Sequence, residues 1–130
     1  MQNTNYTAKV FEHFQHPRNQ GYIKNPDAEA TVGNPTCGDV LKIMLRIDKK
    51  TRTITNIKFQ TMGCAAAIAT SSMLTVLAKG KTLKEAKEIT PKDIEKALGR
   101  LPPIKVHCSN LGAQALHKAI ENYEEQKDIN

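Results

Sequence analysis

Apolar and polar residues alternate through two neighbouring segments of this chain, and that alternation restricts the fold more than any other feature of the sequence. Residues 40–47 place Leu or Ile at every second position, and residues 53–60 resume the pattern with Ile57 and Phe59. A period of two puts successive side chains on opposite faces of a β-strand. The polar segment DKKTR joins the two, so we predict an antiparallel hairpin, preceded by a short strand over residues 28–33.

The apolar spacing becomes helical after the hairpin. From Ala65 to Gly80 apolar residues recur at intervals of three and four, with Val76 on the apolar face, which predicts a helix that ends at the glycine. Four further helices are expected: residues 5–14 with Tyr6, Val10 and Phe14 on one face, a short helix opened by the capping box Thr82–Glu85, a helix from Thr90 to Gly99, and a final helix after Cys108.

This order of elements predicts an α+β domain. We expect a small antiparallel β-sheet of about three strands, with helices packed on one face and a long C-terminal helix. The 130 residues are expected to form a single domain over 1–130, long enough to bury a core without disulfides or a structural metal. Because aromatic residues make up only 5% of the chain and Trp is absent, that core should be aliphatic.

The net charge of +6 is concentrated in the middle of the chain, where residues 38–110 carry fourteen basic and six acidic side chains. Such a surplus attracts nucleic acid, an anionic membrane or an acidic protein. No aromatic residues are interleaved for base stacking, no apolar run approaches the ~20 residues of a membrane span, and no secretion signal opens the chain. We therefore expect a cytoplasmic protein that binds neither nucleic acid nor membrane and uses its basic region toward protein partners.

Three cysteines fall at predicted element boundaries: Cys37 in a turn before a strand, Cys64 before a helix, and Cys108 before the last helix. Their number is odd and no CxxC pair is present, so disulfides explain them poorly and any common site must be assembled by the fold. A helix N-terminus favours the thiolate, the form that binds metals. The competing interpretation, for each cysteine alone, is a small buried hydrophobe.

Asp39 and His107 add an oxygen and an imidazole donor beside the first and third cysteines. Their alternative roles are turn chemistry for the aspartate and a polar helix start for the histidine. Three thiolates with one such donor suit an iron–sulfur cluster or zinc, and not calcium or magnesium. Spacing cannot decide between iron and zinc. The histidines at positions 13, 16 and 117 are expected at helix ends or on a helix surface, and not as ligands.

Four segments together resemble a known family: HPRNQG, GNPTCGDV, GCAAAIATSS and LPPIKVHCSNLG. In order and spacing they are similar to the IscU/NifU family of iron–sulfur cluster scaffold proteins, over about residues 6–125. The resemblance implies a non-enzymatic scaffold that builds a [2Fe–2S] cluster from iron and sulfur and hands it on, with zinc as an occupant of the cluster-free form. It also implies ligands: Cys37, Cys64 and Cys108, with Asp39 as a fourth or exchangeable ligand and His107 as an alternative.

The resemblance implies partners as well. A cysteine desulfurase would deliver sulfur as a persulfide to Cys108, an electron donor such as ferredoxin would reduce it, and apoproteins would receive the cluster. A DnaK-type chaperone would recognise the segment formed by Leu101, Pro102, Pro103, Ile104 and Lys105. The sequence leaves open whether the chain is a monomer or a homodimer bridged by a cluster.

Two other functions compete with the scaffold. A structural zinc domain could use the same three cysteines with Asp39 or His107, since that set also suits tetrahedral zinc. A Cys–His enzyme with Cys108 as nucleophile is disfavoured, because adjacent residues seldom point at one another and no third orienting residue is apparent.

Overall fold

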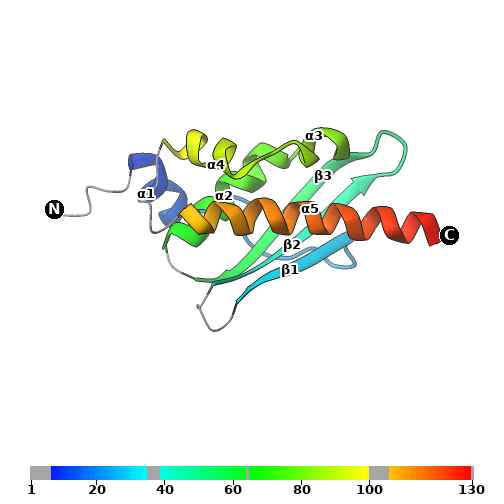
Figure 1. The fold of residues 1–130 in the computed structure, drawn as a ribbon, viewed down its shortest axis with the longest axis horizontal. Helices are drawn as coiled ribbons and strands as arrows, with labels where there is room; N and C mark the ends of the chain where they lie inside the picture. Colours follow the sequence, from blue (N-terminus) through cyan, green and yellow to red (C-terminus); the bar gives the residue numbers. More distant parts are fainter. Residues whose placement is uncertain (1–6, 35–38, 64, 100–105, 130) are drawn as a thin grey trace.

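The computed structural model describes residues 7–34, 39–63, 65–99 and 106–129 (Figure 1). A single three-stranded sheet lies beneath a layer of helices, with the long C-terminal helix running across it, as the sequence predicts. In chain order the elements are α1 (Ala8–Gln15), β1 (Ala28–Asn34), β2 (Asp39–Asp48), β3 (Thr53–Met62), α2 (Ala65–Ala78), α3 (Leu83–Lys87), α4 (Pro91–Leu98) and α5 (Val106–Ile129).

The sheet has the strand order β1-β2-β3, and both neighbouring pairs are antiparallel. The predicted hairpin is confirmed, because β2 pairs with β3 and the alternating residues Ile43, Leu45, Ile57 and Phe59 are completely buried. Helices α5 and α2 pack on the sheet: α5 lies against β1 and β2, and α2 lies against β3 (Figure 1).

The other face of the sheet is crossed by the segment that links α1 to β1 (Figure 1). Gly21 N donates to Phe59 O on β3 at 2.9 Å, and Asp27 N donates to Leu45 O on β2 at the same distance. Because side chains alternate along a strand, Met44 lies on this second face, where it is nevertheless buried. The strand β2 therefore has apolar side chains buried on both sides.

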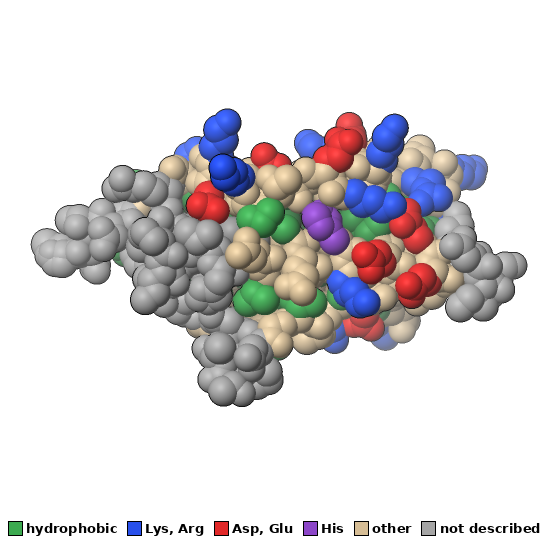
Figure 2. All heavy atoms as spheres, in the orientation of Figure 1, with side chains coloured by type: hydrophobic (Ala, Val, Ile, Leu, Met, Phe, Trp, Pro, Cys, Tyr) green, Lys and Arg blue, Asp and Glu red, His purple; other side chains and the backbone are tan. Residues whose placement is uncertain are grey.

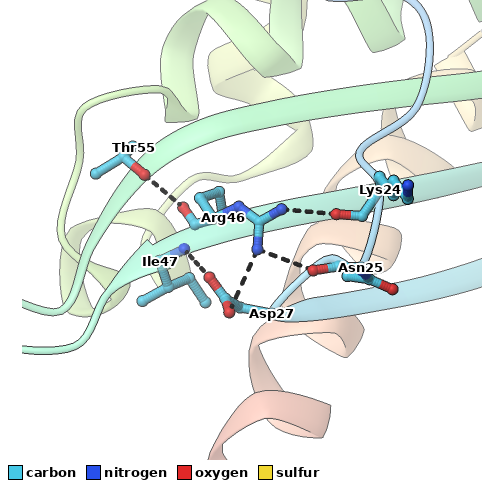
Figure 3. A network of polar contacts seen from close by, with 6 residues as sticks. All are labelled: Lys24, Asn25, Asp27, Arg46, Ile47 and Thr55. Carbon is cyan, nitrogen blue, oxygen red and sulfur yellow. Dashed lines mark hydrogen bonds and ion pairs between the residues drawn. The ribbon is translucent and has the colours of Figure 1, made fainter.

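A polar network fixes the crossing segment to β2 (Figure 3). The Arg46 guanidinium donates to the carbonyl oxygens of Lys24 and Asn25, each at 2.8 Å, and lies 3.6 Å from the Asp27 carboxylate. The second carboxylate oxygen of Asp27 accepts from Ile47 N at 2.8 Å. The register of β2 against β3 shifts between Arg46 and Ile47, so this network holds the strand where its regular ladder is interrupted.

Helix α2 is buried on almost every side, which the amphipathic prediction did not anticipate. Its polar residues Thr70, Ser71, Ser72 and Thr75 are buried, whereas Val76, predicted on the apolar face, is 46% exposed. The reason is its position: α2 contacts α1, α4, α5 and β3 at once, and little of its circumference is left for solvent.

The prediction for the N-terminal helix was wrong about which residues enter the core. Val10 is buried as predicted, but Phe14 is 40% exposed and His13 is buried instead, while Tyr6 lies outside the described residues. Helix α1 faces a polar part of α2, so a histidine that can form a hydrogen bond fits there better than a phenyl ring.

The predicted caps are confirmed. Capping boxes open α3 at Thr82 and α4 at Thr90, and glycines with positive φ follow α2 and α4, namely Gly80 at 87° and Gly99 at 98°. Helix α5 begins at Val106, two residues before Cys108, so the predicted start after Cys108 was too late. Within the described part of the chain, no helix is both long enough and apolar enough to cross a membrane.

Candidate functional site

One end of the sheet, which we call the cysteine end, gathers the described residues that flank the candidate ligands. There β1 ends and β2 begins with the pair Asn34 and Asp39, and β3 ends beside them, where Met62 pairs with Val40. Helix α2 starts three residues after Met62, at Ala65. Cys37 and Cys64 themselves lie outside the described residues.

The first turn of α5 lies at the same end, as one hydrogen bond and the course of the helix show together. Asn122 Nδ2, late in α5, donates to Glu29 O at the start of β1, at 2.9 Å, and α5 runs antiparallel to β1 (Figure 1). Cys108 lies about 21 Å back along the helix from Asn122, and β1 extends about 17 Å from Glu29 to Asn34. Both paths end at the cysteine end, as Figure 1 shows for the start of α5 and the end of β1.

The structure therefore places three of the predicted site residues by their backbone. Asp39 is the first residue of β2, and His107 and Cys108 belong to the first turn of α5. Asp39 and His107 are more than sixty residues apart in the chain, and the elements that carry them converge at one end of the fold. The predicted partner segment Leu101–Lys105 lies outside the described residues, between Gly99 and Val106.

The electrostatics of the cysteine end favour anions. The first N–H groups of an α-helix have no acceptor within the helix, and the helix dipole makes this end positive. Neither α2 nor α5 has an acidic residue in its first turn to compensate it. Two helix N-termini whose positive dipole ends are not compensated therefore favour thiolates and negatively charged ligands at the cysteine end.

The described end of β3 is exposed at the cysteine end. Met62 is 73% exposed and Gly63 is exposed, whereas Ala66 and Ala67, in the first turn of α2, are buried. The end of β3 is therefore open to solvent, whereas the alanines at the start of α2 are packed in the core.

The HPRNQG segment has a positional role that the sequence analysis did not identify. Ser72 Oγ on α2 accepts from Arg18 N at 2.9 Å and lies 2.7 Å from His13 Nδ1, and Asn19 Nδ2 donates to Thr75 Oγ1 at 3.1 Å. Burial lowers the pKa of His13. These hydrogen bonds attach α1 and the turn that follows it to α2, the helix that starts at the cysteine end. The available signal was the pair of serines with Thr70 and Thr75 inside a helix whose other residues are apolar.

Within the described residues, no three His, Cys, Asp or Glu side chains are grouped so that they could hold a metal ion. Because Cys37 and Cys64 lie outside those residues, the predicted ligand set stays a prediction.

Comparison with known proteins gives consistent matches over nearly the whole chain. A family model described as the NifU-like N terminal domain matches residues 5–130. The iron–sulfur cluster assembly scaffold protein IscU 1 of Archaeoglobus fulgidus is 57% identical over 118 residues, which cover 91% of this chain and 76% of that protein. The corresponding IscU of Aquifex aeolicus is 44% identical, with coverage of 91% and 75%.

A solved structure supports the fold. The crystal structure of an N-terminal NifU-like protein from Brucella abortus matches with a TM-score of 0.73 and 22% identity, over 95% of this chain and 97% of that one. The arrangement of three strands and covering helices, the matching family model and the two close relatives agree, and this chain belongs to the IscU/NifU family of iron–sulfur cluster assembly scaffold proteins.

Proposed function

We propose that this chain is a scaffold on which a [2Fe–2S] cluster is assembled and from which it is transferred to apoproteins. The observation that carries the proposal is the convergence at the cysteine end of the elements that flank Cys37, Cys64 and Cys108. The names of the relatives from Archaeoglobus fulgidus and Aquifex aeolicus support the same role.

Three thiolates and one harder donor would hold this cargo. Cys37, Cys64 and Cys108 supply the soft ligands, and Asp39 or His107 supplies the fourth. Such a set binds iron less firmly than four thiolates, because the carboxylate oxygen or imidazole is the weaker partner for a soft cluster. A scaffold needs this balance, since the cluster must form and then leave. The exposed strand end at Met62 and Gly63 would let a recipient approach.

Sulfur would enter through Cys108. Its thiolate attacks the outer sulfur of a persulfide on a cysteine desulfurase, a new S–S bond forms on Cys108, and the donor cysteine leaves as a thiolate. Two electrons from an external donor such as a ferredoxin then reduce the bound sulfur to sulfide. The position of Cys108 in the first turn of α5 supports this role, because the helix start favours the attacking thiolate.

The segment Leu101–Lys105 would serve a DnaK-type chaperone. Only Val106 and His107 separate it from Cys108, so a partner that binds it would act on the chain close to a cluster ligand. Its sequence contains two adjacent prolines, and proline pairs favour the extended polyproline II conformation that a peptide-binding groove can accept.

Anaerobic reconstitution tests the proposal. The chain is incubated with ferrous iron, cysteine and a cysteine desulfurase, and iron and acid-labile sulfide are counted per chain. We expect equal iron and sulfide in the wild type, loss of both in Cys37→Ala, and transfer of the wild-type cluster to an apo-ferredoxin. The matched control is His16→Gln, an exposed residue outside the ligand set, which should retain both.

A different result would favour the zinc domain. If no sulfide-bearing product forms, and the chain instead holds zinc that a chelator removes only with unfolding, the scaffold proposal is wrong.

A further inference from the structure

Five lysines gather at the end of the sheet opposite the cysteine end. We call Lys49, Lys50, Lys79, Lys81 and Lys84 the distal lysine cluster. Two come from the β2–β3 turn, and three come from the linker and helix that follow α2. Figure 2 shows basic side chains gathered over α3 and this turn, at the end where α5 approaches its C-terminus.

Backbone hydrogen bonds hold the two segments together. Gly80 N donates to Ile54 O, Ile54 N donates to Lys81 O, and Leu83 N donates to Arg52 O, each at 2.8 Å. The linker is thereby attached along the beginning of β3. Lysines that are distant in the sequence are brought to one surface by this pairing, and the sequence alone did not group them.

The turn itself is fixed. Asp48 O accepts from Arg52 N at 2.7 Å, and Asp48 Oδ1 accepts from Lys50 N at 2.8 Å. On the other segment, the Glu85 carboxylate accepts from Thr82 N at 3.0 Å in the capping box of α3. The lysines therefore extend from an ordered backbone, which lowers the conformational entropy lost when a partner binds.

The charges of the cluster are not neutralised by neighbours. All five lysines are exposed, and none forms an ion pair within the described residues. Two neighbouring cations, Arg52 and Lys87, both pair with the Glu124 carboxylate of α5, at 3.0 and 2.7 Å. Glu124 is therefore already paired and does not neutralise the five lysines. A net positive surface results.

We propose that the distal lysine cluster is a docking surface for an acidic protein partner. No aromatic residue lies in residues 48–52 or 79–88 on which a base could stack. Asp48, Glu85 and Glu88 are interleaved with the lysines and would repel a uniformly negative phosphate backbone or bilayer. A protein surface that is acidic but carries some basic residues complements this mixed pattern.

The location separates this surface from the cysteine end. Glu124, beside the cluster, lies about 24 Å along α5 from Cys108. A partner docked here would leave the cysteine end open to a second protein. The simultaneous binding of two proteins matters only if the proposed function is right. The binding of an acidic partner to the distal lysine cluster does not depend on that function.

The test uses the chain without an iron–sulfur cluster. The acidic probe is a fluorescent peptide in which glutamates alternate with serines and an occasional lysine, so that it has the mixed charge expected of the partner surface. Binding is measured by anisotropy at about 20 mM and about 200 mM salt, since exposed charges are strongly screened at the higher value. The test variant changes the five cluster lysines to Gln. The control changes five other exposed lysines to Gln and has the same net charge: Lys9, Lys24, Lys92, Lys96 and Lys118.

We expect the test variant to lose at least about fivefold in affinity at low salt and the control less than about twofold, because the effect of a charge depends on its distance from the ligand. In the wild type, amide chemical shifts should change in residues 49–52 and 79–84. This mapping tests the surface even if a variant fails to fold.

Equal losses in the two variants, or shift changes spread over the whole surface, would overturn the proposal. So would tighter binding of duplex DNA or of phosphatidylglycerol vesicles than of the peptide, with the same dependence on the cluster. Reconstitution of the test variant distinguishes the two proposals. Wild-type amounts of iron and sulfide there, together with lost peptide binding, would show that docking and cluster assembly are separate properties.

Discussion

At the scale of single residues, His13 and Ser72 form a polar contact where an apolar one was expected. Ser72 Oγ already accepts a hydrogen bond from Arg18 N, so its own hydrogen is available for Nδ1 of His13. A neutral imidazole with an unprotonated Nδ1 satisfies both groups. Protonation at Nδ1 would place a second donor against the serine oxygen and a charge in a buried site.

The pH dependence of stability tests this contact. Burial lowers the pKa of His13 below its ordinary value of 6.5, with a further decrease from Arg18 and Lys9 and an opposing increase from Glu12. The unfolded chain therefore takes up a proton at higher pH than the folded chain does. The contribution of His13 is complete above 6.5 and is lost as the pH falls through 6.5 toward the folded pKa.

We expect urea unfolding of the wild type to show a larger loss of stability between about pH 8 and about pH 5.5 than His13→Gln shows. The control is His16→Gln, an exposed histidine, which should retain the wild-type pH dependence. An identical pH dependence in the wild type and His13→Gln would contradict the assignment.

At the scale of elements, α1 and α4 meet at their ends. Thr7, the N-cap of α1, donates from Oγ1 to the carbonyl oxygen of Leu98, the last residue of α4. Gly99 follows with a φ of 98°, a conformation that residues with a Cβ rarely adopt. The contact holds the chain immediately before the segment that leads to Cys108.

Two glycine substitutions separate backbone strain from crowding at this contact. In Gly99→Ala, the new Cβ would lie 2.8 Å from Thr7 Cγ2, whereas in Gly80→Ala, with a φ of 87°, it would meet open space. We expect Gly80→Ala to lower the free energy of unfolding by about 1 kcal/mol through strain alone, and Gly99→Ala by about 2–3 kcal/mol. Denaturant titration of the two variants measures both free energies of unfolding. Equal losses would show that Thr7 and α1 move aside without a measurable loss of stability.

At the scale of the whole molecule, Glu124 links three parts that are distant in the chain. Its carboxylate binds Arg52 of the hairpin turn and Lys87 of α3, and thereby holds the C-terminal half of α5 against both. Asn122, half a turn earlier, holds the same helix to β1. These contacts set the direction of α5, and so they determine which end of the sheet receives Cys108.

We expect Glu124→Gln to lower the free energy of unfolding by about 0.5–1 kcal/mol at low salt and by less at high salt, because the paired side chains are partly exposed and screened. Glu121→Gln is the matched control on the same helix. Its carboxylate lies 4.0 Å from Lys118 and both side chains are well exposed, so a change below about 0.5 kcal/mol is expected. Equal losses of unfolding free energy in the two variants would show that the Glu124 ion pairs do not hold α5 in place.

Local patterns predicted most of the elements. The alternation around Ile57 and Phe59 predicted the hairpin, and Thr82 and Thr90 predicted two helix starts, because these signals act between residues close in the chain. The burial of His13, the exposure of Phe14 and Val76, and the binding of the crossing segment by Arg46 were not predictable in this way. Each depends on which element packs against which.

The candidate site, too, could be predicted from the sequence only in part. The sequence by itself determined the donor types, their place at element boundaries and the family resemblance, since residue identity and local spacing carry that information. Only the tertiary structure decided that the starts of β2, α2 and α5 meet at one end of the sheet while five lysines gather at the other. Strand pairing and helix docking join residues far apart in the chain, and their geometry follows from packing that no local pattern specifies.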